Sequence, residues 1–203
     1  MKIKIITTIF LSIFLGVSSA NLKEEFSNYK KYDLTKTKFK LEVVAKELDH
    51  PWALTFIDNK YLIVTERSGG IYKINIKTGK KQEIKHYIQH INHDSGSQGG
   101  LLDSYFNKTD GFIYFTYSHD FKELKLNKKP SNASSTAIAR GKLVGNELKE
   151  LEILLIAQPK QSTNKHFGSR IAIKDNMLYA GFGERDMGMI SQDATKHPGS
   201  IIR

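Results

Sequence analysis

The sequence predicts an all-β protein that forms part of a β-propeller, and three observations lead to this prediction. Apolar and polar residues alternate with period 2 from Phe39 onward. A strand–turn–strand unit recurs, because residues 53–69 read ALTFIDNKYLIVTERSG and residues 170–188 read RIAIKDNMLYAGFGERDMG. No helical periodicity interrupts these units. Repeated antiparallel hairpins are typical of propeller blades of about 40–45 residues, although a β-sandwich remains the alternative because alternation cannot count sheets.

The first twenty residues have the layout of a secretory signal peptide. Lys2 and Lys4 precede an apolar run over residues 5–17, and the small residues Ser18-Ser19-Ala20 follow. The alternative is a membrane anchor, but a span needs about 20 mostly apolar residues and this run is shorter. We therefore expect cleavage after Ala20, a periplasmic or secreted protein, and no stable membrane insertion after cleavage.

Composition excludes several classes of function. The chain has no cysteine, which excludes thiol catalysis and Cys-ligated zinc. The net charge is +10, and without residues 1–20 it would be about +8. The basic residues are mostly scattered lysines, so we expect a solvated surface and no nucleic-acid partner. Residues 21–38 are polar and lysine-rich and are expected to form an N-terminal segment before the domain, which spans residues 39–203.

The first predicted hairpin lies at residues 52–66. Two β-rich runs, Trp52 to Ile57 and Tyr61 to Thr65, flank the turn residues Asp58-Asn59-Lys60. Isoleucines at 71, 74 and 76 then predict a third strand, and Thr78-Gly79-Lys80 predicts a turn before a further short run.

Two more hairpins are predicted, at residues 101–118 and 170–183. The polar stretch 122–135 between them reads KELKLNKKPSNASS, which predicts a surface insertion. At about 40–45 residues a blade, the mature chain has room for three to four blades. The last residues, 199–203, look like a strand that has just begun, so we expect a chain that is truncated at its C-terminus.

The chain has few arginines beside its many lysines. A planar guanidinium with five donors can mark places where lysine cannot substitute. Two of the arginines follow a glutamate at the end of the repeated unit, in Glu66-Arg67 and Glu184-Arg185, although bracing of turns is the simpler interpretation for any one of them. The five are Arg67, Arg140, Arg170, Arg185 and Arg203.

Six segments together resemble one family of enzymes. They are HPWALTFIDNKYLIVTERSGGIYKI, SQGGLLD, STAIARGKL, KHFGSRIAI, GFGERD and SQDATKHPGSIIR, in this order. Over residues 39–203 the chain is similar to the soluble quinoprotein sugar dehydrogenases of the glucose/sorbosone dehydrogenase family, and most of all to aldose sugar dehydrogenases that use pyrroloquinoline quinone (PQQ). The resemblance implies a six-bladed propeller, oxidation of an aldose sugar at C1, PQQ and calcium as cofactors, and an external electron acceptor.

The resemblance also implies roles for particular residues. His166 matches the base that removes the proton of the C1 hydroxyl, and Glu184 matches the acid that orients it. Gln98 matches a glutamine near the sugar and the quinone, and Arg185 and Gln192 are assigned to substrate or cofactor binding. Simpler interpretations stay open: a turn histidine for His166, a local ion pair for Glu184 and Arg185, and a tight turn for Gln98.

The sequence predicts no metal ligand among the residues present. His86, His90, His93 and Asp94 have a ligand-like spacing, but it converges only on a helix and this segment is predicted to be a loop. The resemblance implies that the main PQQ and calcium ligands lie beyond residue 203, so this fragment is expected to be inactive alone. Lys165 stands where relatives often have Asp or Asn. The alternative function is a non-catalytic exported propeller fragment that binds carbohydrate or a protein.

Overall fold

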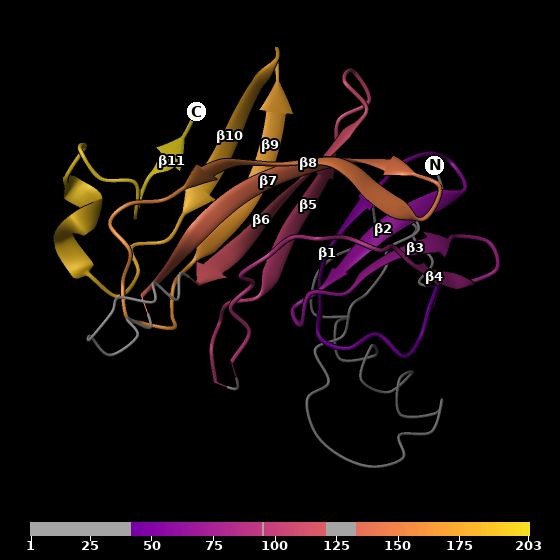
Figure 1. The fold of residues 1–203 in the computed structure, drawn as a ribbon, viewed down its shortest axis with the longest axis horizontal. Coiled ribbons are helices and arrows are strands. Elements are labelled where there is room, and N and C mark those ends of the chain that lie inside the picture. Colours follow the sequence, from indigo (N-terminus) through magenta and orange to yellow (C-terminus); the bar gives the residue numbers. More distant parts are fainter. Residues whose placement is uncertain (1–41, 95, 121–132) are drawn as a thin grey trace, which may run out of the picture. The chain divides into compact units, whose positions relative to one another are not determined.

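The computed structural model describes residues 42–94, 96–120 and 133–203, and Ala45–Arg203 form one compact unit. The predicted signal peptide and the predicted polar segment 21–38 lie outside the described residues. The described residues form antiparallel sheets and one 3-10 helix, Gly188–Gln192, with no α-helix among them (Figure 1). None of the helical structure seen in these ranges has the length and apolarity to cross a membrane.

The first sheet contains four strands in the order of the chain. They are β1 (Pro51–Phe56), β2 (Tyr61–Glu66), β3 (Ile71–Asn75) and β4 (Lys81–Glu83). The turn after β1 forms because Asp58 Oδ1 accepts from the main-chain nitrogens of Lys60 at 2.6 Å and Tyr61 at 2.7 Å. The predicted hairpin 52–66 and the strands after it are therefore confirmed.

The second sheet also has four strands in chain order, and two of them are long. They are β5 (Leu101–Phe106), β6 (Phe112–Asp120), β7 (Ser134–Val144) and β8 (Glu147–Ile156). The hairpin 101–118 is confirmed. The predicted insertion 122–135 mostly lies outside the described residues. For its last two residues the prediction is wrong, because Ser134 and Ser135 are buried in β7. These serines pair with Asp120 and His119 of β6, so the strand begins before its apolar part.

The third sheet has the order β11-β10-β9 and contains the second copy of the repeated unit. Its strands are β9 (Gly168–Lys174), β10 (Met177–Phe182) and β11 (Ile201–Ile202). Asp175 and Asn176 form the two-residue turn of the hairpin with φ of +51° and +59°, a conformation that Asp and Asn adopt more readily than most residues. The hairpin 170–183 and a strand in segment 199–203 are confirmed.

The core shows why the middle strands lack clean alternation. In β2 the burial covers consecutive residues, Leu62 to Glu66, and in β6 it covers Ile113 to His119. Both faces of these strands are covered, so both contribute to packing. One cluster draws on the first two sheets and includes Ile63, Ile71, Leu101, Phe115 and Tyr117. A smaller cluster draws on the second and third sheets and includes Ile138, Ala180 and Phe182.

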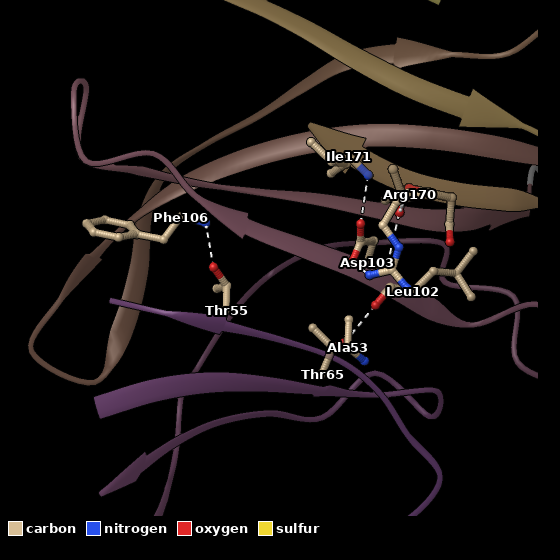
Figure 2. Close-up of polar contacts among 10 residues, drawn as sticks. Ala53, Thr55, Thr65, Leu102, Asp103, Phe106, Arg170 and Ile171 are labelled. Carbon is tan, nitrogen blue, oxygen red and sulfur yellow. Dashed lines mark hydrogen bonds and ion pairs between the residues drawn. The ribbon is translucent and has the colours of Figure 1, made fainter. Parts of the chain in front are cut away.

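Buried threonine hydroxyl groups join successive sheets by the same pattern of hydrogen bonds. Thr65 Oγ1 of β2 accepts from the nitrogen of Ala53 and donates to the carbonyl of Leu102 in β5, at 2.7 Å (Figure 2). Thr116 Oγ1 of β6 repeats this: it accepts from the nitrogen of Asp103 at 3.0 Å and donates to the carbonyl of Ser169 in β9 at 2.9 Å. The repetition fixes each sheet against the first strand of the next.

Asp103 adds a second bond between β5 and β9. Its Oδ2 accepts from the nitrogen of Ile171 at 2.7 Å, and its Oδ1 accepts from Arg170 at 2.8 Å (Figure 2). The Asp103 side chain is almost fully buried, whereas that of Arg170 is 75% exposed. Burial raises the pKa of Asp103, although the main-chain hydrogen bond from Ile171, the charge of Arg170 and the main-chain hydrogen bond from Ser104 act in the opposite direction.

Candidate active site

The candidate site lies where loops meet at one end of the second and third sheets. Gln98 precedes β5, His166 precedes β9, and Glu184 follows β10. Because β9 and β10 are antiparallel, the start of β9 and the end of β10 lie at the same end of their sheet. The fold therefore gathers three residues that are distant in the sequence.

His166 and Glu184 form a direct side-chain pair. The imidazole Nδ1 donates to Glu184 Oε1. An ionised carboxylate can only accept a hydrogen bond, so Nδ1 carries a proton, and Nε2 is the nitrogen that has the lone pair when the ring is neutral. The hydrogen bond to His166 is the main cause that lowers the pKa of Glu184, which keeps it ionised. The side chain of His166 is 42% exposed, so a ligand can reach the ring.

Gln98 contacts His166 through the main chain. Its side-chain Oε1 accepts from the nitrogen of His166 at 2.9 Å, and its own nitrogen donates to the carbonyl of Asn164, also at 2.9 Å. The two loops are therefore connected by hydrogen bonds in both directions. This arrangement places the Gln98 amide next to the histidine backbone, and the NH2 group of the amide is the part that can still donate to a ligand.

Two glycines let the loops of His166 and Glu184 cross at close range. A Cβ on Gly183 would lie 2.0 Å from the carbonyl oxygen of His166, and a Cβ on Gly168 would lie 2.5 Å from the nitrogen of Gly183. Gly168 also has φ of +72°, which favours glycine. His166 itself has φ of +52°, a sparsely populated conformation for a residue with a side chain. The strained backbone turns its imidazole toward Glu184.

Arg185 is buried, and its side chain contacts the main chain of the loop before His166. Its exposed fraction is 2%. The Nη atoms donate to the carbonyl of Lys165, to that of Thr163 at 2.6 Å and to Ser134 Oγ at 3.0 Å, and the guanidinium lies over the ring of Phe167, 3.5 Å from its centroid. Burial lowers the pKa of Arg185 to about 10, so it stays charged at neutral pH. Cofactor binding by Arg185 stays a prediction, and these contacts support a different role.

Arg67 makes similar contacts on the other loop, which the sequence analysis did not assign to the site. Its Nη2 donates to the carbonyl of Ser97 at 2.8 Å and its Nε to that of Gly99 at 3.1 Å. These carbonyls flank Gln98. The signal that could have found this role was the repeat itself, because Arg67 and Arg185 each follow a glutamate at the end of the same unit.

The remaining predicted residues lie differently. Gln192 is exposed at the end of the 3-10 helix, and its assignment to ligand binding stays a prediction. Asp186 joins the pair, since His166, Glu184 and Asp186 place possible metal-ligand atoms within 4.8 Å of one another. This is the only such group in the part of the chain that the structure describes, so His86, His90 and His93 do not form one there. His86 instead contacts the carbonyl of Gly69 at 2.7 Å.

The chain is similar to known aldose sugar dehydrogenases. Aldose sugar dehydrogenase YliI of Escherichia coli is 28% identical over 170 residues, which are 80% of this chain and 43% of that protein. The crystal structure of the soluble aldose sugar dehydrogenase from Escherichia coli in the apo form matches with a TM-score of 0.68 and 26% identity, over 79% of this chain and 45% of that one. The PQQ-bound aldose sugar dehydrogenase from Streptomyces coelicolor matches with a TM-score of 0.65 and 27% identity, over 80% and 46%.

These matches establish the fold and the family. The structural neighbours are β-propellers, so the three sheets are part of a propeller, as predicted. The chain spans less than half the length of the relatives that it matches. The profile of the family described as Glucose / Sorbosone dehydrogenase matches residues 48–203, which is most of the chain. The chain therefore belongs to the glucose/sorbosone dehydrogenase family.

Proposed function

We propose that this chain carries the proton-accepting part of the active site of a PQQ-dependent dehydrogenase that oxidises an aldose at C1. The observation that supports this most is the pair of His166 and Glu184, with a half-exposed imidazole whose Nδ1 donates to an ionised carboxylate. The alternative, a non-catalytic propeller that binds carbohydrate or a protein, is not favoured because the family match covers the loops that carry this pair.

The chemistry of the pair suits proton removal from a sugar hydroxyl. His166 Nε2 has the lone pair and accepts the proton of the C1 hydroxyl. The ring then becomes an imidazolium, which the charge of Glu184 stabilises through Nδ1. The Gln98 amide can donate to a sugar oxygen from the same side as the histidine backbone. Glu184 acts through the ring and is therefore a positioning residue.

The cationic side chains at this site would supply only some of the partners that bound PQQ needs. PQQ, when bound, supplies the acceptor for the hydride of C1. Its carboxylates need cationic partners, but the buried Arg185 guanidinium already donates to loop carbonyls. Lys165 is exposed and precedes His166 in the sequence, so its ammonium is a candidate partner for an anionic group. Calcium is carried over from the family resemblance, as is an external electron acceptor.

The place of action follows from residues 1–20. We propose export to the periplasm or the medium and cleavage after Ala20, since these residues have the layout of a signal peptide. Intact mass of the exported protein tests this. A product that retains residues 1–20 would contradict the proposal.

Dye reduction with a panel of aldoses, PQQ and calcium tests the activity. We expect negligible turnover from residues 21–203 alone, and turnover once the chain is extended with the remaining propeller of a relative. In the extended protein His166→Asn should lower kcat by about 10²- to 10⁴-fold. Asn tolerates the positive φ of this position, so the fold should persist. Unchanged turnover in His166→Asn would remove His166 from the role of base.

A further inference from the structure

We propose that Arg67 and Arg185 are a pair of positioning residues that clamp the two loops of the site, one on the Gln98 side and one on the His166 side. The inference rests on the proposed function only in taking His166 as the base. Both arginines end the same repeated unit of sequence, and both bind main-chain carbonyls two residues apart.

The geometry of the two clamps is alike. Arg67 binds the carbonyls of residues 97 and 99, on either side of Gln98. Arg185 binds the carbonyls of residues 163 and 165, directly before His166. Two carbonyls of one loop can accept from different nitrogens of one planar guanidinium, whereas a lysine offers a single nitrogen. This explains arginine at these two positions in a chain whose basic residues are mostly lysines.

Hydrogen bonds join the two clamped loops, and one of them reaches His166 itself. The nitrogen of His166 donates to Gln98 Oε1, so a shift of either loop changes the same contact. Arg185 also acts on the far side of the loop, because its own nitrogen donates to the carbonyl of His166 at 3.3 Å. Residues 184 and 185 thus hold the histidine from two sides, with Glu184 on the imidazole and Arg185 on the main chain.

Charge makes these bonds strong, and burial makes their loss costly. A guanidinium that donates to carbonyls forms charge-assisted hydrogen bonds, which are about twice as strong as neutral ones. Arg185 is buried, and burial lowers its pKa although the charge of Glu184 acts in the opposite direction. The Glu184 side chain is directed at His166 and not at Arg185. The positive charge of Arg185 is therefore balanced mainly by loop carbonyls, which ties the loop to the arginine.

The test compares Arg185→Met and Arg67→Met with the control Arg140→Met. Arg140 also lies over a phenylalanine, 4.4 Å from the centroid of the Phe112 ring, but it pairs with Glu152 and touches neither loop. Amide hydrogen exchange reports on the nitrogens of His166 and Gln98, with the nitrogens of Asn107 and Gly111 in the distant β5–β6 turn as references. Both loop variants should accelerate exchange at His166 and Gln98 by on the order of tenfold relative to the references, and Arg140→Met should not.

The ring of His166 gives a second readout that blade stability alone would not change. Its two ring nitrogens have separate ¹⁵N signals, and the hydrogen bond to Glu184 fixes the proton on Nδ1. In Arg185→Met we expect this signature to average toward a mixture of tautomers, while Arg140→Met keeps it. Neither readout needs PQQ or sugar, so an inactive extended enzyme would contradict the proposed function and leave the clamps standing.

Two outcomes would overturn the proposal. One is wild-type exchange and a wild-type ¹⁵N signature in folded Arg67→Met and Arg185→Met. The other is loss of folding in both, and also in Arg67→Lys and Arg185→Lys, while Arg140→Met folds, because this would assign the arginines to blade stability and not to the loops. If only the methionine variants fail to fold, the lysine variants carry the same measurement, with faster exchange expected because the single nitrogen of lysine lacks the fixed fork that reaches both carbonyls.

Discussion

Gln98 Oε1 accepts a hydrogen bond from the main-chain nitrogen of His166, 2.9 Å away, so the glutamine holds the backbone of the histidine and not its ring. Ring orientation is left to Glu184, which contacts Nδ1. The two neighbours of His166 therefore have separate tasks: one fixes where the residue lies, and the other fixes the tautomer.

The first prediction separates these tasks by changing Gln98. Gln98→Leu removes the acceptor of the His166 nitrogen, and Gln98→Glu keeps an oxygen there. A single hydrogen bond contributes about 0.5–1.5 kcal/mol, so amide exchange at His166 should accelerate about two- to tenfold in Gln98→Leu and stay near the wild-type rate in Gln98→Glu. Equal exchange rates in the two variants would show that this bond does not hold the loop.

The second prediction concerns Glu184. Glu184→Gln has the same shape but no charge, so it no longer stabilises an imidazolium at His166. In the extended protein we expect turnover of the aldose to fall by at least about tenfold, with an unchanged melting temperature because the contact lies at the surface. The measurement is dye reduction together with thermal unfolding. Turnover at the wild-type level would leave the pair as a local ion pair without a role in the reaction.

The hairpins could be predicted from the sequence because their signals are local, whereas Gln98, His166 and Glu184 were assigned from the family resemblance and their roles stay a prediction. Asp58 marks a turn because its short side chain accepts hydrogen bonds from the main chain. Asp175 marks a turn because aspartate tolerates a main-chain conformation with positive φ. The contacts of Arg185 could not be predicted from local sequence, because its burial depends on which loop packs over it in the folded chain. The start of β7 at Ser134 was missed because its first residues are polar serines, which nevertheless pair through the main chain with β6.

The third prediction concerns His119, which is buried in β6 at 2% exposure. Burial, followed by the positive charges of Lys160 and His90, lowers the pKa of His119 from 6.5 to about 4. Between these pH values the unfolded chain binds a proton that the folded chain does not. The free energy of unfolding should therefore decrease as the pH falls from 6.5 to 4, by up to about 3 kcal/mol.

Urea unfolding across this range, compared with His119→Gln, isolates the contribution of this histidine. Glutamine does not titrate, so the difference between the two proteins should change with pH in this window and stay constant above pH 7. A difference that is flat throughout would show that His119 is protonated equally in both states.

The fourth prediction compares the two sides of the ion pair between β5 and β9. Asp103→Asn leaves one oxygen where two accepted, next to the nitrogen of Ile171 and the guanidinium of Arg170. An unsatisfied buried group costs about 1–3 kcal/mol, so the melting temperature should fall by several degrees. Arg170→Gln removes only the exposed partner and should cost at most about 1 kcal/mol. An equal loss in the two variants would mean that the ion pair, and not the bond to Ile171, joins the strands.

The last prediction uses two glycines that lie two residues apart in the sequence. A Cβ on Gly183 would lie 2.0 Å from the carbonyl oxygen of His166, whereas a Cβ on Gly181 would meet no atom within 4 Å. Gly183→Ala must therefore push the His166 loop away, which breaks the contact with Glu184 and destabilises the fold by about 1–3 kcal/mol. Gly181→Ala has open space, and in β10 it should be neutral or slightly stabilising.

Thermal unfolding and the ¹⁵N signature of His166 measure both effects in the same samples. We expect Gly183→Ala to lower the melting temperature and to abolish the signature of a proton fixed on Nδ1, and Gly181→Ala to retain both wild-type properties. In the extended protein only Gly183→Ala should lose turnover, since a displacement of about 1 Å can lower a rate about 100-fold. A wild-type signature in Gly183→Ala would mean that the loop can move without affecting the pair, and the close crossing of the two loops would then have no role in placing His166.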